Sequence, residues 1–219
     1  MVTKAVEKTF WTDINQVPKQ YPWLTDNLEC EIAIIGGGVT AALCALRFAE
    51  AGCSTIMLSA SPIGFGGTAA SAGMMSIDAE QCINTLVDKI GADRAMMTTQ
   101  LLTEAVNNIE TLCNGFDDDC GFRRMDSLRY ADDVRNAETL RREYSLRLHN
   151  GINVQLLTNI NVEYVYTAKN GRTDDGLPVL GRKPEEDKIA YALCFGDDGL
   201  LYSEIAGRLL LEQYQGKSN

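Results

Sequence analysis

The chain has 219 residues, of which 45% are hydrophobic and 23% are charged, and its formal net charge at pH 7 is −10. These proportions are ordinary for a globular protein of one large domain or two small ones. The acidic balance argues against a nucleic-acid or anionic-membrane partner, because phosphate neutralisation needs Lys and Arg, but it is compatible with a bound nucleotide cofactor.

The sequence shows no targeting segment, no membrane segment and no metal-site pattern. Residues 1–8 carry too few apolar side chains for a signal peptide, and no apolar run approaches the ~20 residues of a membrane span. The seven cysteines are dispersed without a C-x-x-C pair, and His149 is the only histidine. This pattern favours reduced thiols in a cytoplasmic protein over a disulfide framework, a zinc site or a His-based triad.

Residues 1–28 are expected to form an irregular lead-in to the main domain. Pro18 and Pro22 interrupt regular structure, and aromatic residues such as Trp11 and Trp23 are expected to fasten the segment to a surface.

The next 30 residues predict a parallel βαβ unit. Residues 30–35 form a short apolar run that ends in three glycines, as a buried strand does. Residues 39–51 are good helix formers, and Gly52 is a natural helix stop. Residues 54–58 then read as a second buried strand.

The remaining elements follow from the same criteria. A loop rich in Gly, Ala and Ser covers residues 60–76, and Asp78 with Gln81 resembles a capping box at the start of a helix that ends at Gly91. The later expected elements are a helix around 102–112, an extended segment at 121–131, a charged helix at 133–148, strands at 152–157, 162–167 and 189–195, turns at 170–178, and a closing helix at 200–214.

The glycine turn carries the clearest chemical signal. Residues 36–41 match G-x-G-x-x-A, an accepted form of the dinucleotide-binding fingerprint. Gly36 permits the tight turn, Gly38 lets the backbone approach a pyrophosphate, and Ala41 allows close packing of helix on strand. The N–H groups of the helix start at Val39 and Thr40, with the positive end of the helix dipole, would then face the phosphates.

One part of the fingerprint is absent. An acidic residue at the end of the second strand normally binds the ribose hydroxyls, about 20 residues on. Ser59, followed by Ala60, stands at that position, and a serine hydrogen-bonds a ribose more weakly than a carboxylate does. Nicotinamide and flavin cofactors share the fingerprint, so the fingerprint leaves both open.

The loop that follows resembles the second cofactor loop of the D-amino-acid oxidase and glycine oxidase (DAO) family, whose members depend on FAD. That loop reads GFGGTAASAG over residues 64–73, and in the family it passes beside the flavin and its pyrophosphate. Residues 21–24, 119–122 and 126–128 are also similar to the family. The resemblance implies FAD as the cofactor and contacts to it from Gly67, Thr68, Ala69 and Ser71.

The C-terminal part is similar to the same family. Residues 174–182 resemble the segment that re-enters the cofactor domain, which implies contacts from Gly176 and Pro178. Residues 189–216 resemble the last strand, a flavin-side loop and the final helix, which places Gly196, Gly199 and Leu200 beside the flavin. A positive helix end there would stabilise negative charge on reduced flavin.

The resemblance covers most of residues 20–160 and 163–216 and breaks around 157–161. Longer family members carry there a substrate-binding β-sheet with a carboxylate-binding Arg and an active-site Tyr, so no catalytic residue is assigned in this chain. Ser59 at the ribose position is one departure from the family pattern. Asp197 and Asp198 depart from it as well, because two carboxylates beside a reduced flavin are unfavourable.

The implied fold is α/β: a Rossmann-like FAD/NAD(P)-binding domain whose substrate β-sheet is mostly missing. Its N-terminal block covers residues 29–160 and its C-terminal block residues 163–219. The N-terminal βαβ unit and the strand near residue 190 are expected to share one parallel sheet. The helices at 79–113 and 133–149 are expected to cover that sheet.

Three functions remain open at this stage. The first is an FAD-dependent oxidoreductase that takes hydride from the C–H bond beside the nitrogen of a small amine or amino acid. The second is a non-catalytic nucleotide-binding or interaction protein that arose by internal loss and associates with itself or with a protein partner over the uncovered region. The third is an NAD-binding module. The loop at 64–73 disfavours this function, because it resembles a loop of an FAD-dependent family.

Several polar and charged residues are expected to have structural rather than functional roles. His149 is expected at an exposed helix end, and residues 117–119 form a solvated turn without calcium-loop spacing. The acidic neighbours of Cys120 disfavour a reactive thiolate. The Arg and Glu residues between 135 and 147 are expected to form a salt-bridged helix face.

Overall fold

The computed structural model describes residues 9–14, 20–78, 81–118, 120–131, 133–157, 177–182, 185–186, 188–193 and 199–217. The chain forms two compact units. The first comprises Met1–Met74, Val179–Leu193 and Gly199–Asn219, and the second comprises Met75–Pro178 and Cys194–Asp198. In the part of the chain that is described, no helix combines the length and apolar character needed to cross a bilayer.

The first unit contains the predicted βαβ motif. Strand β1 (Ile32–Ile35) leads into helix α2 (Val39–Glu50), which returns to strand β2 (Thr55–Leu58). The two strands pair in parallel, with Ile32 opposite Thr55 and Ile35 opposite Leu58. Helix α2 ends before Gly52, whose φ of +83° suits glycine. This small parallel sheet is compatible with a Rossmann-like domain.

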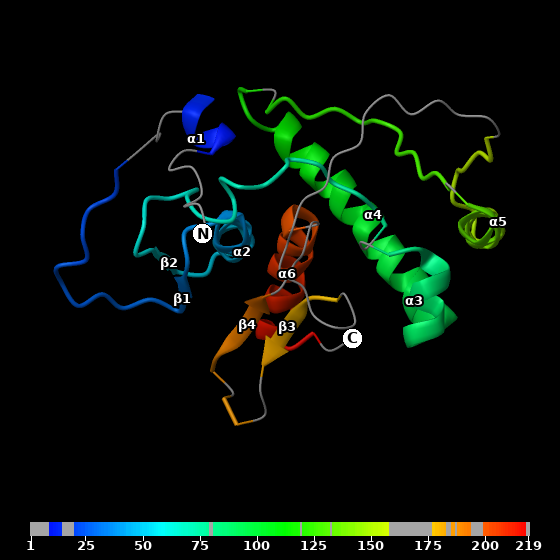
Figure 1. Ribbon diagram of the computed structural model, residues 1–219. Helices are drawn as coiled ribbons and strands as arrows, with labels where there is room; N and C mark the ends of the chain where they lie inside the picture. The colour runs from blue at the N-terminus through cyan, green and yellow to red at the C-terminus, as the bar shows by residue number, and fades with distance from the viewer. Residues whose placement is uncertain are drawn as a thin grey trace, which may run out of the picture. The chain divides into compact units, whose positions relative to one another are not determined.

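Helix α6 (Gly199–Tyr214) packs directly against α2 (Figure 1). Leu43 and Phe48 of α2 and Leu201 and Ile205 of α6 are buried and form the core of this unit. Full burial of such a side chain stabilises the fold by roughly 1.5–3 kcal/mol. The closing helix predicted at 200–214 is therefore confirmed.

The two helices approach each other closely because α6 carries Gly207 at the contact. A Cβ built on Gly207 would lie 3.2 Å from the Leu43 carbonyl oxygen, 3.2 Å from Cγ of Arg47 and 3.4 Å from Cα of Cys44. Beside this contact, Arg47 Nη2 lies 2.9 Å from Oε1 of Glu204, whose side chain is 1% exposed. A glycine and an ion pair therefore set the distance between the helices.

Burial at this interface affects the chemistry of Cys44. Removal from water raises the pKa of its thiol from 9.0 to about 11. At pH 8 the thiolate fraction is then about 100-fold smaller than for a thiol of pKa 9.0. We expect iodoacetamide to modify Cys44 at least about 100-fold more slowly than a small exposed thiol, measured by peptide mass spectrometry. The half-buried Cys53 of the same unit is the control, and equal rates at the two cysteines would contradict this result.

The late strand does not join the parallel sheet, so this prediction is wrong. Strand β4 (Ala190–Leu193) pairs antiparallel with β3 (Val179–Arg182), with Val179 opposite Leu193 (Figure 1). The two strands are close in sequence, and a short connection permits an antiparallel pair, whereas a parallel pair needs a long crossover. Among the described residues the structure thus has two separate two-stranded sheets.

The lead-in is fastened by one of its two tryptophans. Trp11 lies in the short helix α1 (Phe10–Ile14), and its indole nitrogen donates a hydrogen bond of 2.6 Å to the carbonyl of Ser71. Its ring lies against Gly73, where a Cβ would come within 2.9 Å of Cζ2. Trp23, in contrast, is 88% exposed, so the expected anchoring is confirmed for Trp11 and wrong for Trp23.

Within its described residues, the second unit contains three helices, as predicted. They are α3 (Ile83–Ile90), α4 (Ala92–Asn114) and α5 (Val134–His149). Gly91, with φ of +86°, separates α3 from α4, and Asp133 caps α5 by accepting a hydrogen bond from the Asn136 amide. Ile83, Leu86 and Leu102 are among its most buried side chains.

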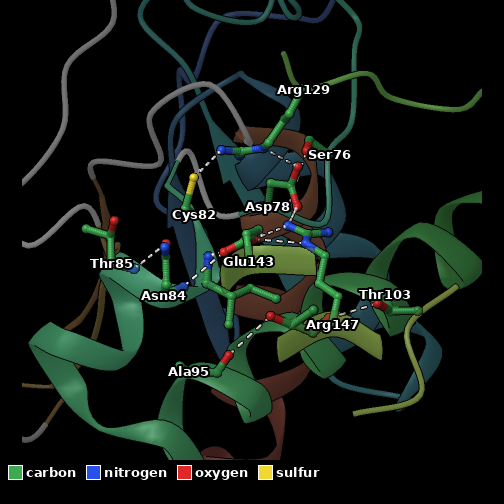
Figure 2. A network of polar contacts seen from close by, with 12 residues as sticks. Ser76, Asp78, Cys82, Asn84, Thr85, Ala95, Thr103, Arg129, Glu143 and Arg147 are labelled. Carbon is green, nitrogen blue, oxygen red and sulfur yellow. Dashed lines mark hydrogen bonds and ion pairs between the residues drawn. The ribbon is translucent and has the colours of Figure 1, made fainter. Parts of the chain in front are cut away.

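The predicted capping box at Asp78 and Gln81 is wrong. Helix α3 begins at Ile83 after Cys82, which makes no side-chain capping bond. The cap comes instead from α5, because the carboxylate of Glu143 accepts hydrogen bonds from the amides of Ile83 (2.9 Å) and Asn84 (3.0 Å) (Figure 2). A carboxylate from a distant helix thus satisfies two of the donors that every helix start leaves open.

Asp78 belongs to the same buried network. Its carboxylate accepts from Arg147 and, at 3.1 Å, from Nε of Arg129 (Figure 2). Arg147 also lies 2.8 Å from Glu143. Burial lowers the pKa of Arg147, but its hydrogen bonds to Asp78 and Glu143 outweigh burial and raise this pKa overall. The predicted salt-bridged helix face exists here, but at Glu143 and Arg147 it is buried rather than solvated.

Two expected extended segments have no strand pairing. Residues 121–131 and 152–157 lie outside every helix and ladder of the described structure. The segment at 121–131 is held by side chains instead, through Arg124 to α4 and Arg129 to Asp78. The strand expected at 162–167 and the turns at 170–176 lie outside the described residues.

Candidate functional site

The candidate site lies in the first unit, where β1 turns into α2. Gly36 has φ of +142°, a conformation that L side chains rarely adopt. Gly38 is the extended N-cap of α2 and offers no side chain to cap the helix. A Cβ on Gly36 would lie 3.6 Å from Cβ of Ala41, so the turn sits directly against the first turn of the helix. The residues of the turn itself therefore contribute backbone, and no side chains, to the helix start.

Gly37, which the fingerprint leaves unspecified, is also required. A Cβ at this position would lie 2.3 Å from Oγ of Ser59 and 3.2 Å from Cδ1 of Ile63. The carbonyl of Gly37 accepts a hydrogen bond of 2.8 Å from the Gly64 amide. Sequence reasoning missed this residue, because its neighbours come from the end of β2 and the loop beyond.

The loop at 64–73 lies over the start of α2. The Val39 amide donates a hydrogen bond of 2.9 Å to Oγ1 of Thr68. A Cβ on Gly38 would come within 3.0 Å of the same oxygen. The structure thus brings together Gly38, Val39 and Thr68, three of the sequence-predicted site residues. The first N–H groups of a helix have no partner within the helix and commonly bind an anionic oxygen. Thr68 Oγ1 occupies that position here.

Ser59 lies beside the glycine turn, at the position expected for the ribose. Its hydroxyl donates a hydrogen bond of 2.7 Å to the Ser61 carbonyl and accepts one of 3.3 Å from the Ser61 amide. The hydroxyl hydrogen is therefore used within its own turn. A ribose hydroxyl can bind Ser59 only by donating to the serine oxygen.

Ser203, in the N-terminal part of α6, lies against the first turn of α2. Oγ1 of Thr40 and Oγ of Ser203 are 2.7 Å apart, and Ser203 in turn donates to the Gly199 carbonyl. Two predicted site residues, Thr40 and Gly199, are therefore connected through Ser203. Sequence reasoning missed Ser203, because a serine inside a helix gives no pattern by which to find it. Both helix starts contribute the positive ends of their dipoles to this region.

The other predicted site residues are distributed as follows. Ala60, Gly67, Ala69 and Ser71 lie in the loop after β2, where Ala69 is buried and the Ser71 carbonyl accepts from Trp11. Leu200 lies in the first turn of α6, and Pro178 belongs to the second unit. Gly176 and Gly196 lie outside the described residues.

The residues present fit a dinucleotide pyrophosphate. Side chains are excluded at Gly37, where a Cβ would overlap Ser59, and restricted at Gly38. At Gly38 the absence of a Cβ lets the Thr68 oxygen reach the backbone, and a phosphate oxygen could take the same place. The start of α2 supplies N–H donors and a positive dipole end. The fit rests on backbone geometry and does not depend on a charged side chain.

Comparisons with known proteins agree with this geometry. A family model described as DAO, FAD dependent oxidoreductase, matches residues 31–168. Gamma-glutamylputrescine oxidoreductase of Escherichia coli (strain K12) is 30% identical over 100 residues, which cover 46% of this chain and 24% of that protein. The probable oxidoreductase OrdL of Haemophilus influenzae (strain Rd) is 24% identical over 117 residues, covering 53% of this chain and 27% of that protein. No solved structure matches the chain.

The match covers only a small part of each relative. The chain spans about a quarter of the length of these two relatives. The expected break around residues 157–161 falls almost entirely outside the described residues.

Proposed function

The chain belongs to the DAO family of FAD-dependent oxidoreductases, and from this membership we propose that its first unit binds FAD and that the protein oxidises a small amine or amino acid. FAD is the cofactor of the family. The residues proposed to hold it are those around the start of α2 and in the loop at 64–73.

The observation that carries the proposal is the contact between that loop and the helix start. The Val39 amide donates to Thr68 Oγ1 at 2.9 Å, beside a glycine whose Cβ would touch the same oxygen. Backbone donors and a close approach are what a pyrophosphate needs. We propose that Gly36, Gly38 and Ala41 form the turn, that the Thr40 amide binds a phosphate, and that a phosphate oxygen replaces Thr68 Oγ1 at the Val39 amide.

The other residues would orient the cofactor. We propose that Ser59 accepts a hydrogen bond from a ribose hydroxyl, and that Gly199 and Leu200 bring the start of α6 to the flavin ring. A positive helix end there would stabilise negative charge on the ring. When bound, FAD supplies the acceptor for the hydride of a C–H bond beside nitrogen, and the protein supplies binding, orientation and electrostatics.

The substrate class rests on two supports. The chain resembles amine and amino-acid oxidases in the loop at 64–73, and one relative is named for gamma-glutamylputrescine. We propose oxygen or another acceptor as the destination of the electrons. We propose a cytoplasmic location from the dispersed cysteines of the sequence, which include no C-x-x-C pair.

A second candidate is a non-catalytic FAD-binding or interaction protein. The specific observation in its favour is the short span, about a quarter of each relative's length. Ile35, at the end of β1, is also 81% exposed, which suits a further protein surface covering that strand. Retained flavin with no oxidation of any amine or amino acid tested would favour this candidate.

The test is FAD binding to the purified full chain and to a Gly38→Ala variant. We expect a flavin absorption spectrum in the purified protein, or uptake of added FAD followed by quenching of flavin fluorescence. The variant should bind FAD at least tenfold more weakly, because the new Cβ meets Thr68 Oγ1 at 3.0 Å and stands on the approach to the phosphates.

Gly115→Ala is the matched control for this experiment. Like Gly38, Gly115 caps a helix and has a negative φ. A Cβ at Gly115 would lie 3.3 Å from the Leu112 carbonyl oxygen, a contact similar to the one at Gly38. Gly115 belongs to the second unit, whereas the proposed FAD site lies in the first. Its FAD affinity should equal that of the wild type. Circular dichroism of both variants separates loss of binding from loss of folding. A colourless wild-type protein that takes up no added FAD would overturn the proposal.

A further inference from the structure

The loop at 64–73 is fastened both to the start of α2 and to the lead-in. In its middle, Oγ1 of Thr68 accepts a hydrogen bond of 2.9 Å from the Val39 amide. Near its end, the Ser71 carbonyl accepts one of 2.6 Å from the indole nitrogen of Trp11. One short loop therefore connects the candidate phosphate site with helix α1 of the lead-in.

A single hydrogen-bonded turn joins these two contacts. The Ser71 amide donates to the Thr68 carbonyl at 3.2 Å. In the same turn the Ala70 amide donates to the Gly66 carbonyl, also at 3.2 Å. The side chain of Ala69, between them, is buried. The turn and its buried alanine hold Thr68 in place, and the contact with α1 holds the turn.

The position of Thr68 creates a conflict at the helix start. The Val39 amide has one hydrogen to donate, and Oγ1 of Thr68 accepts it. A Cβ on Gly38 would lie 3.0 Å from the same oxygen, so this oxygen also fills the space beside the Gly38 backbone. A phosphate oxygen that binds the Val39 amide needs the same donor and the same space. Thr68 and the phosphate therefore exclude each other at this position.

We propose that Thr68 is an internal competitor of the cofactor phosphate, and that Trp11 stabilises the competing position. This competition rests on the proposed function, because it takes place at the same site. A ligand that binds only after Thr68 has left the Val39 amide has its affinity reduced by the fraction of molecules in which Thr68 has left. A hydrogen bond of ordinary net strength makes that reduction about two- to twelvefold.

Trp11 contributes to the competition from 60 positions earlier in the sequence than Ser71. Besides its hydrogen bond to Ser71, its ring lies against Gly73, where a Cβ would come within 2.9 Å of Cζ2. Both contacts fix the end of the loop that carries Thr68. Coupling between two sites is reciprocal. Withdrawal of the lead-in from the loop therefore favours the cofactor, and the bound cofactor favours that withdrawal.

ADP binding to the full chain, measured by calorimetry, tests the proposal, because ADP carries the pyrophosphate of FAD without the flavin. Thr68→Ala should bind ADP about two- to twelvefold more tightly than the wild type, since no side-chain oxygen competes for the Val39 amide. Thr68→Val should bind no more tightly than the wild type, because its second γ-carbon still fills the space beside Gly38. Thr25→Ala, at an exposed threonine of the same unit, is the control and should match the wild type.

Hydrogen exchange at the Val39 amide gives a readout that requires no ligand. In Thr68→Ala this amide should exchange at least twofold faster than in the wild type, and added ADP should slow it again. Circular dichroism shows whether the variant is folded. An unchanged exchange rate in a folded Thr68→Ala would overturn the proposal, because Thr68 would then not occupy this donor.

Trp11→Phe tests the contribution of the lead-in. Phenylalanine keeps an aromatic ring but has no N–H for the Ser71 carbonyl, so ADP should bind about two- to threefold more tightly. The exchange of the Val39 amide should be faster as well. Trp23→Phe, at an exposed position of the same unit, is the control and should leave both values unchanged. Equal ADP affinity in the two variants would overturn the role of Trp11.

The same affinity series with FAD, followed by quenching of flavin fluorescence, should give the same order of variants. Weaker binding of both ligands to Thr68→Ala than to the wild type would overturn the competition and make Thr68 a donor to the phosphate. The proposed function would stand in that case. A wild-type chain that binds neither FAD nor ADP would overturn the proposed function together with the competition.

Discussion

Replacing Glu143 with alanine is expected to lower the free energy of unfolding of the second unit by about 3–5 kcal/mol. The Glu143 side chain is 4% exposed, and it caps α3 through the Ile83 and Asn84 amides at 2.9 and 3.0 Å. It also accepts from Nε of Arg147 at 2.9 Å. Its removal leaves two buried donors and part of a buried guanidinium without an acceptor, and each such loss is costly.

Urea denaturation followed by circular dichroism measures this change, since three helices dominate the signal of the second unit. Glu138→Ala, an exposed position on the same helix, is the control and should fall within about 0.5 kcal/mol of the wild type. Glu143→Gln should lie between the two, because an amide oxygen still accepts but carries no charge. Faster hydrogen exchange confined to α3 would locate the loss. Equal stability of Glu143→Ala and Glu138→Ala would contradict the buried cap.

Replacing Gly207 with leucine is expected to destabilise the first unit by about 3 kcal/mol. The new Cβ would lie 3.2 Å from the backbone oxygen of Leu43, and the rest of the side chain has no space between α2 and α6. Gly207→Ala is expected to be nearly neutral. The better helix propensity of alanine, about 1 kcal/mol, offsets the small separation of the helices that its methyl group demands.

Tryptophan fluorescence follows this unit, because both tryptophans belong to it and Trp11 lies against Gly73. Gln213→Leu, at an exposed position of the same helix, is the control for adding a leucine. Its stability should stay within about 0.5 kcal/mol of the wild type. If Gly207→Leu and Gln213→Leu lower the free energy of unfolding equally, the close approach of α2 and α6 is not required for the stability of the first unit. Weaker FAD binding should accompany the loss at Gly207, since α6 supports the helix proposed to bind the phosphates.

Elements with strong local signals were predicted well from the sequence. Helix α2 lies between three glycines and Gly52, and α5 begins at Asp133, whose side chain caps it. The parallel pairing of β1 with β2 followed from their short apolar runs and the helix between them. In these cases the information lies within a few residues of the element.

Features set by distant residues were not predicted. The cap of α3 comes from Glu143, 60 positions later, whereas Asp78 and Gln81 offered a plausible local pattern. The partner of β4 was misassigned, because an apolar run does not reveal which strand lies beside it. At the candidate site the fingerprint indicated Gly38 and Val39, but the roles of Gly37 and Ser203 depend on contacts made only in the folded chain.

The remote cap of α3 also bears on the order in which the second unit forms during synthesis. A helix of eight residues nucleates poorly by itself, and this one lacks a cap until residue 143 has been added. At ribosomal speeds of about 5–20 residues per second, those 60 positions take roughly 3–12 s. Helix α4 has 23 residues and local backbone hydrogen bonds, so it can form in the meantime. The emerging chain therefore presents α4 first, and α3 becomes stable only when α5 docks and delivers its carboxylate.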